Sequence, residues 1–203
     1  MIEQREILVR DLGRILAKIG ALQFGAFTLP NGELSPYYID FKVVPSFPSA
    51  FQKVIDAYIG LIKNSIGLSN LDALCGISIT SLPYASTIAY CVKKPLIYIK
   101  GVDEVKKSIE GFITPGWKVV ILENFIRTGT SFIRAAEIVR SESGIVENAI
   151  VLVDGLEGGK NRLDKAGIKL HSLTNIKEIA FLLHDMNVIN DQQLKVIYKR
   201  IKW

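Results

Sequence analysis

The chain has 203 residues, of which 49% are apolar and 22% charged, with Gly 16 and Pro 7. These values exclude intrinsic disorder, collagen-like repeats and low-complexity sequence, and the length suffices for one domain with a substantial core. The net charge of +5 suits an anionic small substrate and is too modest to indicate a nucleic-acid partner.

The two cysteines, Cys75 and Cys91, exclude a disulfide framework and a cysteine-rich zinc site. We interpret both as buried thiols of a cytoplasmic protein. The apolar runs are shorter than the ~18 residues that a membrane span needs, and residues 1–6 are charged rather than typical of a secretion signal. His171 and His184 are too few and too far apart to build a metal site. We therefore expect no membrane partner, no nucleic-acid partner and no metal ligand from the protein.

The first expected elements are a helix, a hairpin and a second helix. Apolar residues recur at helical spacing over 7–19, and Gly20 follows as a stop. Strands at 24–29 and 34–40 flank a Pro-Asn-Gly turn, and a helix at 48–66 opens with Pro48.

Strands and helices alternate through the rest of the chain. The expected strands are 73–76, 95–99, 118–122, 145–153 and 168–173, the expected helices are 82–92, 131–141, 157–166 and 175–184, and a basic amphipathic segment covers 195–202. This alternation is typical of βαβ units with right-handed crossovers. It predicts one α/β domain over 1–203, with a small N-terminal hood at 1–45 and a core at 46–203.

The most informative segment is 119–131, with the sequence VVILENFIRTGTS. Four apolar residues predict a strand buried on both faces, and Glu123 and Asn124 follow at its carboxyl end, where open α/β sheets bind ligands. The loop Thr128-Gly129-Thr130-Ser131 then enters a helix, so N–H groups, hydroxyls and the positive helix end converge. This pattern favours a phosphate site, although similar turns also occur without a ligand.

The same segment resembles the phosphoribosyl pyrophosphate motif of type I phosphoribosyltransferases, with four apolar residues, two acidic positions and a Thr-Gly loop. Further stretches resemble the orotate branch of that family: 24–29 with Gly32 and 35–40, 109–111 ahead of 116–119, and 151–154. The resemblance implies a type I phosphoribosyltransferase-like α/β fold, in which helices flank a central, mostly parallel sheet. It also implies a homodimer, and Mg²⁺ that arrives with phosphoribosyl pyrophosphate.

The resemblance assigns roles to particular residues. Glu123 and Asn124 would hold the ribose hydroxyls, the Thr-Gly loop would hold the 5′-phosphate, and Tyr37 and Tyr38, which we expect to be half-buried, would lie beside the base. The implied substrate-binding residues are Tyr37, Tyr38, Ser78, Thr80, Ser81, Glu123, Asn124, Arg127, Thr128, Gly129, Thr130 and Ser131. The implied catalytic residues are Lys100, Lys106 and Lys107, in a segment (100–107) that replaces the family's mobile catalytic loop in shortened form.

Four positions depart from the family pattern. Pro30 and Gly101 stand where the family has lysines, Asn124 replaces the second acid, and Gly155 replaces an arginine that pairs with the orotate carboxylate. Two hypotheses follow. The chain is an orotate phosphoribosyltransferase of pyrimidine biosynthesis, or it is a catalytically weak or silent protein of the same fold that binds a phosphorylated ribose and acts as a regulator or partner. A phosphoribosyltransferase for another base is a third possibility.

Overall fold

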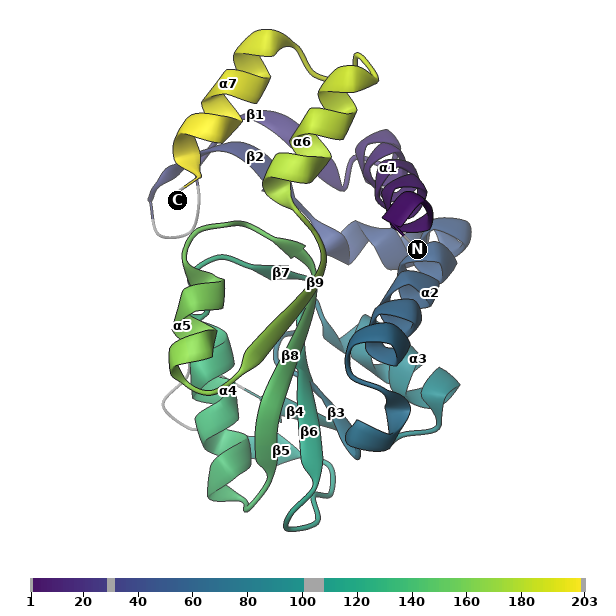
Figure 1. Cartoon of the computed structure of the whole chain (residues 1–203), viewed down its shortest axis with the longest axis vertical. Helices are drawn as coiled ribbons and strands as arrows, with labels where there is room; N and C mark the ends of the chain where they lie inside the picture. Colours follow the sequence, from purple (N-terminus) through teal and green to yellow (C-terminus); the bar gives the residue numbers. More distant parts are fainter. Residues whose placement is uncertain (1, 29–31, 101–107, 202–203) are drawn as a thin grey trace.

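A mostly parallel β-sheet runs through the larger part of the protein (Figure 1). The computed structural model describes residues 2–28, 32–100 and 108–201. Within these ranges the sheet consists of β3 (Ala73–Gly76), β4 (Leu96–Lys100), β5 (Ser108–Glu110), β6 (Lys118–Leu122), β7 (Phe125–Ile126), β8 (Ile145–Asp154) and β9 (Lys169–Asn175). The strand order is β5-β4-β3-β6-β8-β7, with β9 also paired to β8. β5 is antiparallel to β4, and the other pairs are parallel.

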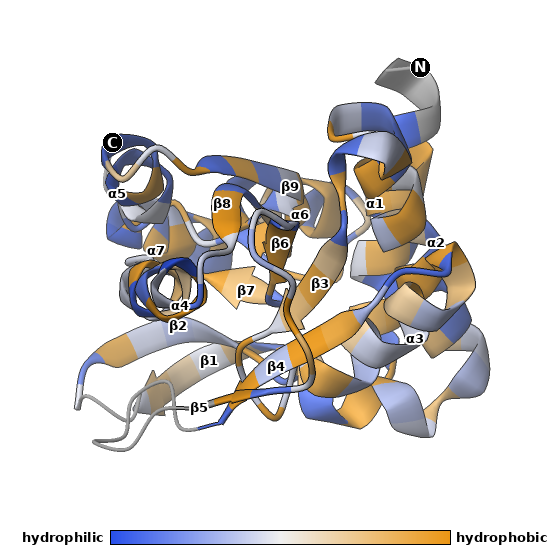
Figure 2. Cartoon of the chain, turned by 90° about the horizontal axis from the view of Figure 1, so that it is seen from below, coloured by the Kyte–Doolittle hydropathy of each residue, from blue (hydrophilic) through white to orange (hydrophobic). Residues whose placement is uncertain are grey.

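Helices cover both faces of this sheet. One face carries α1 (Ile2–Lys18), α2 (Pro48–Ser65), α3 (Leu82–Val92) and α6 (Ile176–Asp185), and the other carries α4 (Thr130–Ser141) and α5 (Gly159–Lys165). Along β6, Val119 and Ile121 pack with α4 and α5, whereas Val120 and Leu122 pack with the helices of the opposite face. Because successive side chains of a strand point to opposite faces, the continuous apolar run of β6 contributes to the hydrophobic cores on both sides of the sheet. Figure 2 shows the hydrophobic strands between the two helical layers.

The N-terminal hairpin forms a separate small sheet. β1 (Leu22–Thr28) and β2 (Leu34–Ile39) are antiparallel, with a register shift between Phe24 and Phe27. A 3₁₀ helix, η1 (Phe41–Ser46), leads from this hairpin to α2, and a second one, η2 (Leu68–Asn70), precedes β3. The last helix, α7 (Asp191–Arg200), packs on β2, and its Arg200 donates to the Leu34 carbonyl oxygen. The division into a hood at 1–45 and a core at 46–203 stays a prediction.

Most of the expected elements are present. The expected strands 73–76 and 118–122 and the expected helix 82–92 match β3, β6 and α3 at both ends. The strands β5 and β7 were not expected, since three and two residues are too short for a periodic pattern to show.

The interpretation of both cysteines as buried is wrong for one of them. Cys75 on β3 is fully buried, and burial raises the pKa of its thiol to about 12. Cys91 lies on the outer side of α3 and is exposed, because the helix turns this position away from the sheet. In the described part of the chain, no helix combines the length and the apolar character that a membrane crossing requires.

Candidate active site

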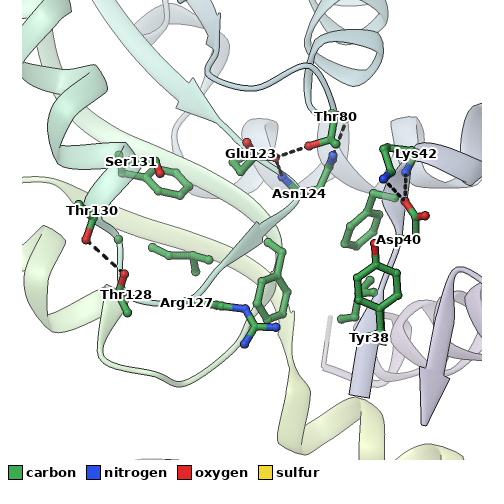
Figure 3. A pocket seen from close by; sticks show the side chains of 16 residues that line it. Tyr38, Asp40, Lys42, Thr80, Glu123, Asn124, Arg127, Thr128, Thr130 and Ser131 are labelled. Atoms are coloured by element: carbon green, nitrogen blue, oxygen red, sulfur yellow. Dashed lines mark hydrogen bonds and ion pairs between the residues drawn. The ribbon is translucent and has the colours of Figure 1, made fainter. Parts of the chain in front are cut away.

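A pocket of about 420 Å³ lies where β6 and β7 end and α4 begins. The described residues that line it are 38–42, Thr80 and 123–132. They come from the end of the hairpin, the loop after β3 and the segment from β6 into α4, as Figure 3 shows. These segments meet because parallel strands end at the same edge of a sheet, where their loops gather.

The predicted phosphate loop forms one side of this pocket. Gly129 has φ +77°, and a Cβ there would lie 2.6 Å from Leu163 Cδ1, so the tight turn requires glycine. No side chain caps α4, which leaves the N–H groups of its first turn available beside the hydroxyls of Thr128, Thr130 and Ser131. The Thr128 and Thr130 hydroxyls are 3.2 Å apart. With the positive end of the helix dipole, this geometry suits an anion such as a phosphate.

Glu123 lines the pocket directly after β6. Its Oε1 accepts the N–H of Asn124 at 2.8 Å and the Thr80 hydroxyl at 3.5 Å. Burial raises the pKa of this carboxyl above its ordinary value of 4.5, and hydrogen bonds from Ser78, Asn124 and Thr80 oppose the rise. A carboxylate in this position can accept hydrogen bonds from the hydroxyls of a sugar.

Asn124 faces inward, although it borders the same pocket. Its side chain is 1% exposed, its Nδ2 donates to the Thr80 carbonyl oxygen at 2.9 Å, and its Oδ1 accepts the Tyr58 hydroxyl at 3.1 Å. Both polar ends of the amide are therefore engaged within the protein. The geometry favours a role in holding the Thr80 loop rather than the ribose contact that the resemblance implies.

The hydroxyl groups of the loop after β3 have different roles, and they belong to Ser78, Thr80 and Ser81. Thr80 lines the pocket, and its Oγ1 lies 2.7 Å from the Ser78 Oγ, which stands behind it. Ser81 is fully buried, and its Oγ accepts the N–H groups of Ile77 and Ser78 at 3.2 and 3.1 Å. The structure thus brings Thr80 to the site and uses Ser78 and Ser81 to shape the loop.

The two neighbouring tyrosines also separate. Tyr38 lines the pocket and is partly exposed, whereas Tyr37 is 1% exposed and donates its hydroxyl to Glu157 Oε1 at 3.1 Å. The expectation that both are half-buried is wrong for Tyr37, because alternate residues of β2 face opposite sides.

Of the cations expected at the site, one lines the pocket, one does not, and two lie outside the described residues. Arg127 lines the pocket and pairs with Glu157 at 3.0 Å. Lys100 ends β4 and is not among the described residues that line the pocket. Lys106 and Lys107, with the rest of the expected lid at 101–107, lie outside the described residues.

Sequence reasoning gave no role to Asp40 and Lys42, which line the pocket from the start of η1. The Asp40 Oδ1 accepts the Lys42 N–H at 3.0 Å and lies 3.8 Å from the Lys42 ammonium nitrogen. Their position in the sequence could have indicated this role, because a charged pair directly after the second strand of the hairpin forms a polar strand end.

A parallel sheet with an acidic residue after its central strand, followed by a Thr-Gly loop at a helix start, defines a type I phosphoribosyltransferase. No family model matches the chain. It is 35% identical to an orotate phosphoribosyltransferase of Cenarchaeum symbiosum, over 96% of this chain and 98% of that protein. The chain belongs to the orotate phosphoribosyltransferase family.

Solved structures agree with this membership. An orotate phosphoribosyltransferase from Aeropyrum pernix superposes with a TM-score of 0.74 and 30% identity, covering 87% of this chain and 99% of the other. The Leishmania donovani UMP synthase gives a TM-score of 0.84 and 30% identity over 95% of this chain and 42% of that longer protein. The predicted fold class is confirmed.

Proposed function

We propose that this protein transfers the phosphoribosyl group of phosphoribosyl pyrophosphate to orotate, giving orotidine monophosphate and pyrophosphate in pyrimidine biosynthesis. One observation carries the proposal: the half-buried carboxylate of Glu123 and the loop 128–131 line a single pocket in a member of this family. The partners proposed are therefore small molecules. A cytoplasmic location stays a prediction.

The pocket supports the following arrangement of the donor. The loop 128–131 takes the 5′-phosphate, and Glu123 accepts hydrogen bonds from the ribose hydroxyls. The bond between ribose C1 and the pyrophosphate oxygen breaks, and its electron pair leaves with pyrophosphate. The N1 nitrogen of orotate forms the new bond to C1 and releases its proton to solvent. The barrier of this step arises mainly from charge separation. Hydrogen-bond donors and cations that are already in position therefore lower it.

Mg²⁺ fits this pocket as an ion that arrives with the donor. Within the described residues, no group of three or more His, Cys, Asp or Glu side chains gathers as a metal site. Mg²⁺ commonly takes its ligands from substrate phosphates, waters and one or two carboxylates, and Glu123 is a carboxylate of the pocket lining that would stand beside it. When bound, the ion neutralises charge that develops on the leaving pyrophosphate.

We further propose that Lys106 or Lys107 supplies a catalytic cation from a lid. Lys106→Ala or Lys107→Ala should then lower turnover by about 100-fold and leave phosphate binding nearly intact. Wild-type turnover in both variants would show that the catalytic cation lies elsewhere.

We also propose a homodimer, as the family resemblance implies. Light scattering at micromolar concentration should give about twice the chain mass of 22.5 kDa. A single-chain mass would contradict this.

The decisive experiment is an orotate turnover assay with phosphoribosyl pyrophosphate and Mg²⁺, run beside calorimetry of each ligand alone. Turnover supports the transferase. Donor binding without turnover supports the alternative of a silent phosphoribosyltransferase-fold protein, which the departures at Pro30, Gly101 and Gly155 favour. Turnover with another base, and none with orotate, would point to a different acceptor.

A further inference from the structure

Arg127 is a fixed cation in the pocket wall. The described lining residues include two cations, Arg127 and Lys42. The Lys42 side chain is 58% exposed and lies beside its own carboxylate partner, Asp40. The Arg127 side chain is 28% exposed and is held from several sides. The two cations therefore differ in how far they are preorganised for a ligand.

The contacts of Arg127 fix the plane of its guanidinium. Its central carbon lies 5.3 Å from the ring centroid of Phe125 and 5.7 Å from that of Tyr37, and its Nη1 donates to Glu157 Oε1 at 3.0 Å. Glu157 is 13% exposed, and its second oxygen lies 3.5 Å from Arg200 Nη2. Because this carboxylate is shared between two guanidinium groups, it orients Arg127 without neutralising it fully.

Gly155 explains how the arginine reaches this position. β7 runs parallel to β8, with Phe125 opposite Val153 and Ile126 opposite Asp154, and the Gly155 N–H donates to the Ile126 carbonyl at 2.8 Å. A Cβ at residue 155 would lie 2.7 Å from Phe125 Cζ. The missing side chain at the end of β8 thus leaves room for the Phe125 ring, on which the guanidinium rests.

The guanidinium points away from the phosphate loop. In Figure 3 the Arg127 side chain extends from the hydroxyls of Thr128 and Thr130 toward the side of the pocket where Tyr38 lies. A cation that served the 5′-phosphate would turn toward the loop. The acceptor of the proposed reaction carries a carboxylate, and a planar guanidinium binds a carboxylate through two parallel hydrogen bonds.

We propose that Arg127 recognises the carboxylate of the acceptor base and that Glu157 is the positioning residue that holds Arg127 for this task. The inference rests on the proposed function and assigns the specificity for an anionic base to one side chain. Because the guanidinium is already held in place, it loses little conformational entropy when the base binds.

The test compares orotate with uracil, which has the same ring and no carboxylate. Wild-type protein should prefer orotate, and Arg127→Gln should lower kcat/KM for orotate by about 100-fold, mainly through KM. The weak reaction with uracil and the calorimetric affinity for phosphoribosyl pyrophosphate should change by less than about threefold. Arg127→Lys keeps the charge, loses the planar fork and should recover only part of the preference.

Arg10→Gln is the matched control, since this exposed arginine of α1 pairs with Asp185 outside the pocket. It should leave both substrates unaffected. Thermal unfolding of each variant separates a loss of recognition from a loss of fold. The inference is wrong if Arg127→Gln keeps wild-type kcat/KM for orotate, if it weakens the donor instead, or if Lys42→Gln alone removes the preference.

Calorimetry with orotate and uracil separates this inference from the proposed function. A wild type that gives no turnover but binds orotate, with that binding lost in Arg127→Gln, overturns the transferase and supports the inference. A wild type that neither binds orotate nor turns it over overturns both. Turnover of orotate that is insensitive to Arg127 overturns the inference alone.

The positioning role of Glu157 has its own readout. Glu157→Gln keeps the size of the side chain, removes its charge and should raise KM for orotate about tenfold with kcat and the donor affinity nearly unchanged. Glu157→Asp should restore part of the loss. A uniform fall of kcat for both acceptors, or a change confined to thermal stability, would contradict the positioning role.

Discussion

The side-chain amide of Asn124 donates a hydrogen bond of 2.9 Å to the main-chain carbonyl of Thr80. This bond ties the end of β6 to the loop after β3, so the residue that faces the ribose in the family motif here fixes the pocket wall. An aspartate could not make the bond when ionised, because a carboxylate has no proton to donate. The departure from the acidic pattern therefore has a structural cause.

Asn124→Asp should lower the free energy of unfolding by about 1–3 kcal/mol at neutral pH, since it leaves the Thr80 carbonyl without its donor and buries a charge near Glu123. The loss should shrink on acidification, because a protonated carboxyl can donate again. Chemical denaturation at two pH values measures both effects. Asn64→Asp, which adds the same charge at an exposed site on α2, serves as the control. An equal loss in the two variants would contradict the explanation.

Glu123 should make the stability depend on pH. Burial raises the pKa of its carboxyl above 4.5, so the folded state holds the proton more tightly than the unfolded state. The resulting stabilisation is complete below the unfolded pKa and is lost as the pH rises through the folded pKa. Glu123→Gln carries no titrating proton. The free energy of unfolding of this variant should therefore increase relative to that of the wild type as the pH rises from 4.5 through the folded pKa of Glu123.

Urea denaturation across this pH range measures the difference between variant and wild type. Glu147→Gln, at an exposed position of β8, removes a carboxyl in the same way and is the matched control. A difference for Glu123→Gln that does not vary with pH would mean that the Glu123 carboxyl is solvated in solution.

The sequence predicts the strand and the loop that carry the site better than it predicts the directions in which their side chains point. The strand 118–122 and the following loop could be located because a continuous apolar run, two polar residues and a Thr-Gly turn are local patterns. That Tyr37 is buried while Tyr38 lines the pocket depends on which face of the hairpin meets Phe125 of β7 and Glu157. Such a choice is set by tertiary packing, which no local pattern encodes.

The same limit explains Ser81 and Glu157. Ser81 lies in the expected loop, but its hydroxyl turns inward to close that loop on itself. In the sequence, Glu157 is only the first residue of an expected short helix. No local pattern indicates its contacts, because its partners Arg127 and Tyr37 lie 30 and 120 residues away in the chain.

Thr130→Val should weaken the binding of ribose 5-phosphate by about 1.5–3 kcal/mol, the range for a hydrogen bond to a charged group. The hydroxyl that it removes lies at the first residue of α4, beside the uncapped N–H groups. Isothermal calorimetry measures the change. Thr87→Val on α3, whose hydroxyl donates to the Pro83 carbonyl at 2.8 Å outside the pocket, is the matched control. Unchanged affinity in Thr130→Val would place the phosphate elsewhere.

Gly155→Ala should destabilise the protein by about 1–3 kcal/mol through crowding alone. A Cβ there would meet Phe125 Cζ at 2.7 Å and the Ile126 carbonyl oxygen at 2.8 Å, so the ring or the strand end must move. The family's arginine cannot return to this position without the same displacement, which would also unseat Arg127 from the Phe125 ring. Gly60→Ala, on α2 with no atom within 4 Å of the added Cβ, is the matched control and should gain up to about 1 kcal/mol. Equilibrium denaturation compares the two variants, and a Gly155→Ala protein as stable as the wild type would show that the end of β8 has room for a side chain and that Phe125 does not depend on the glycine.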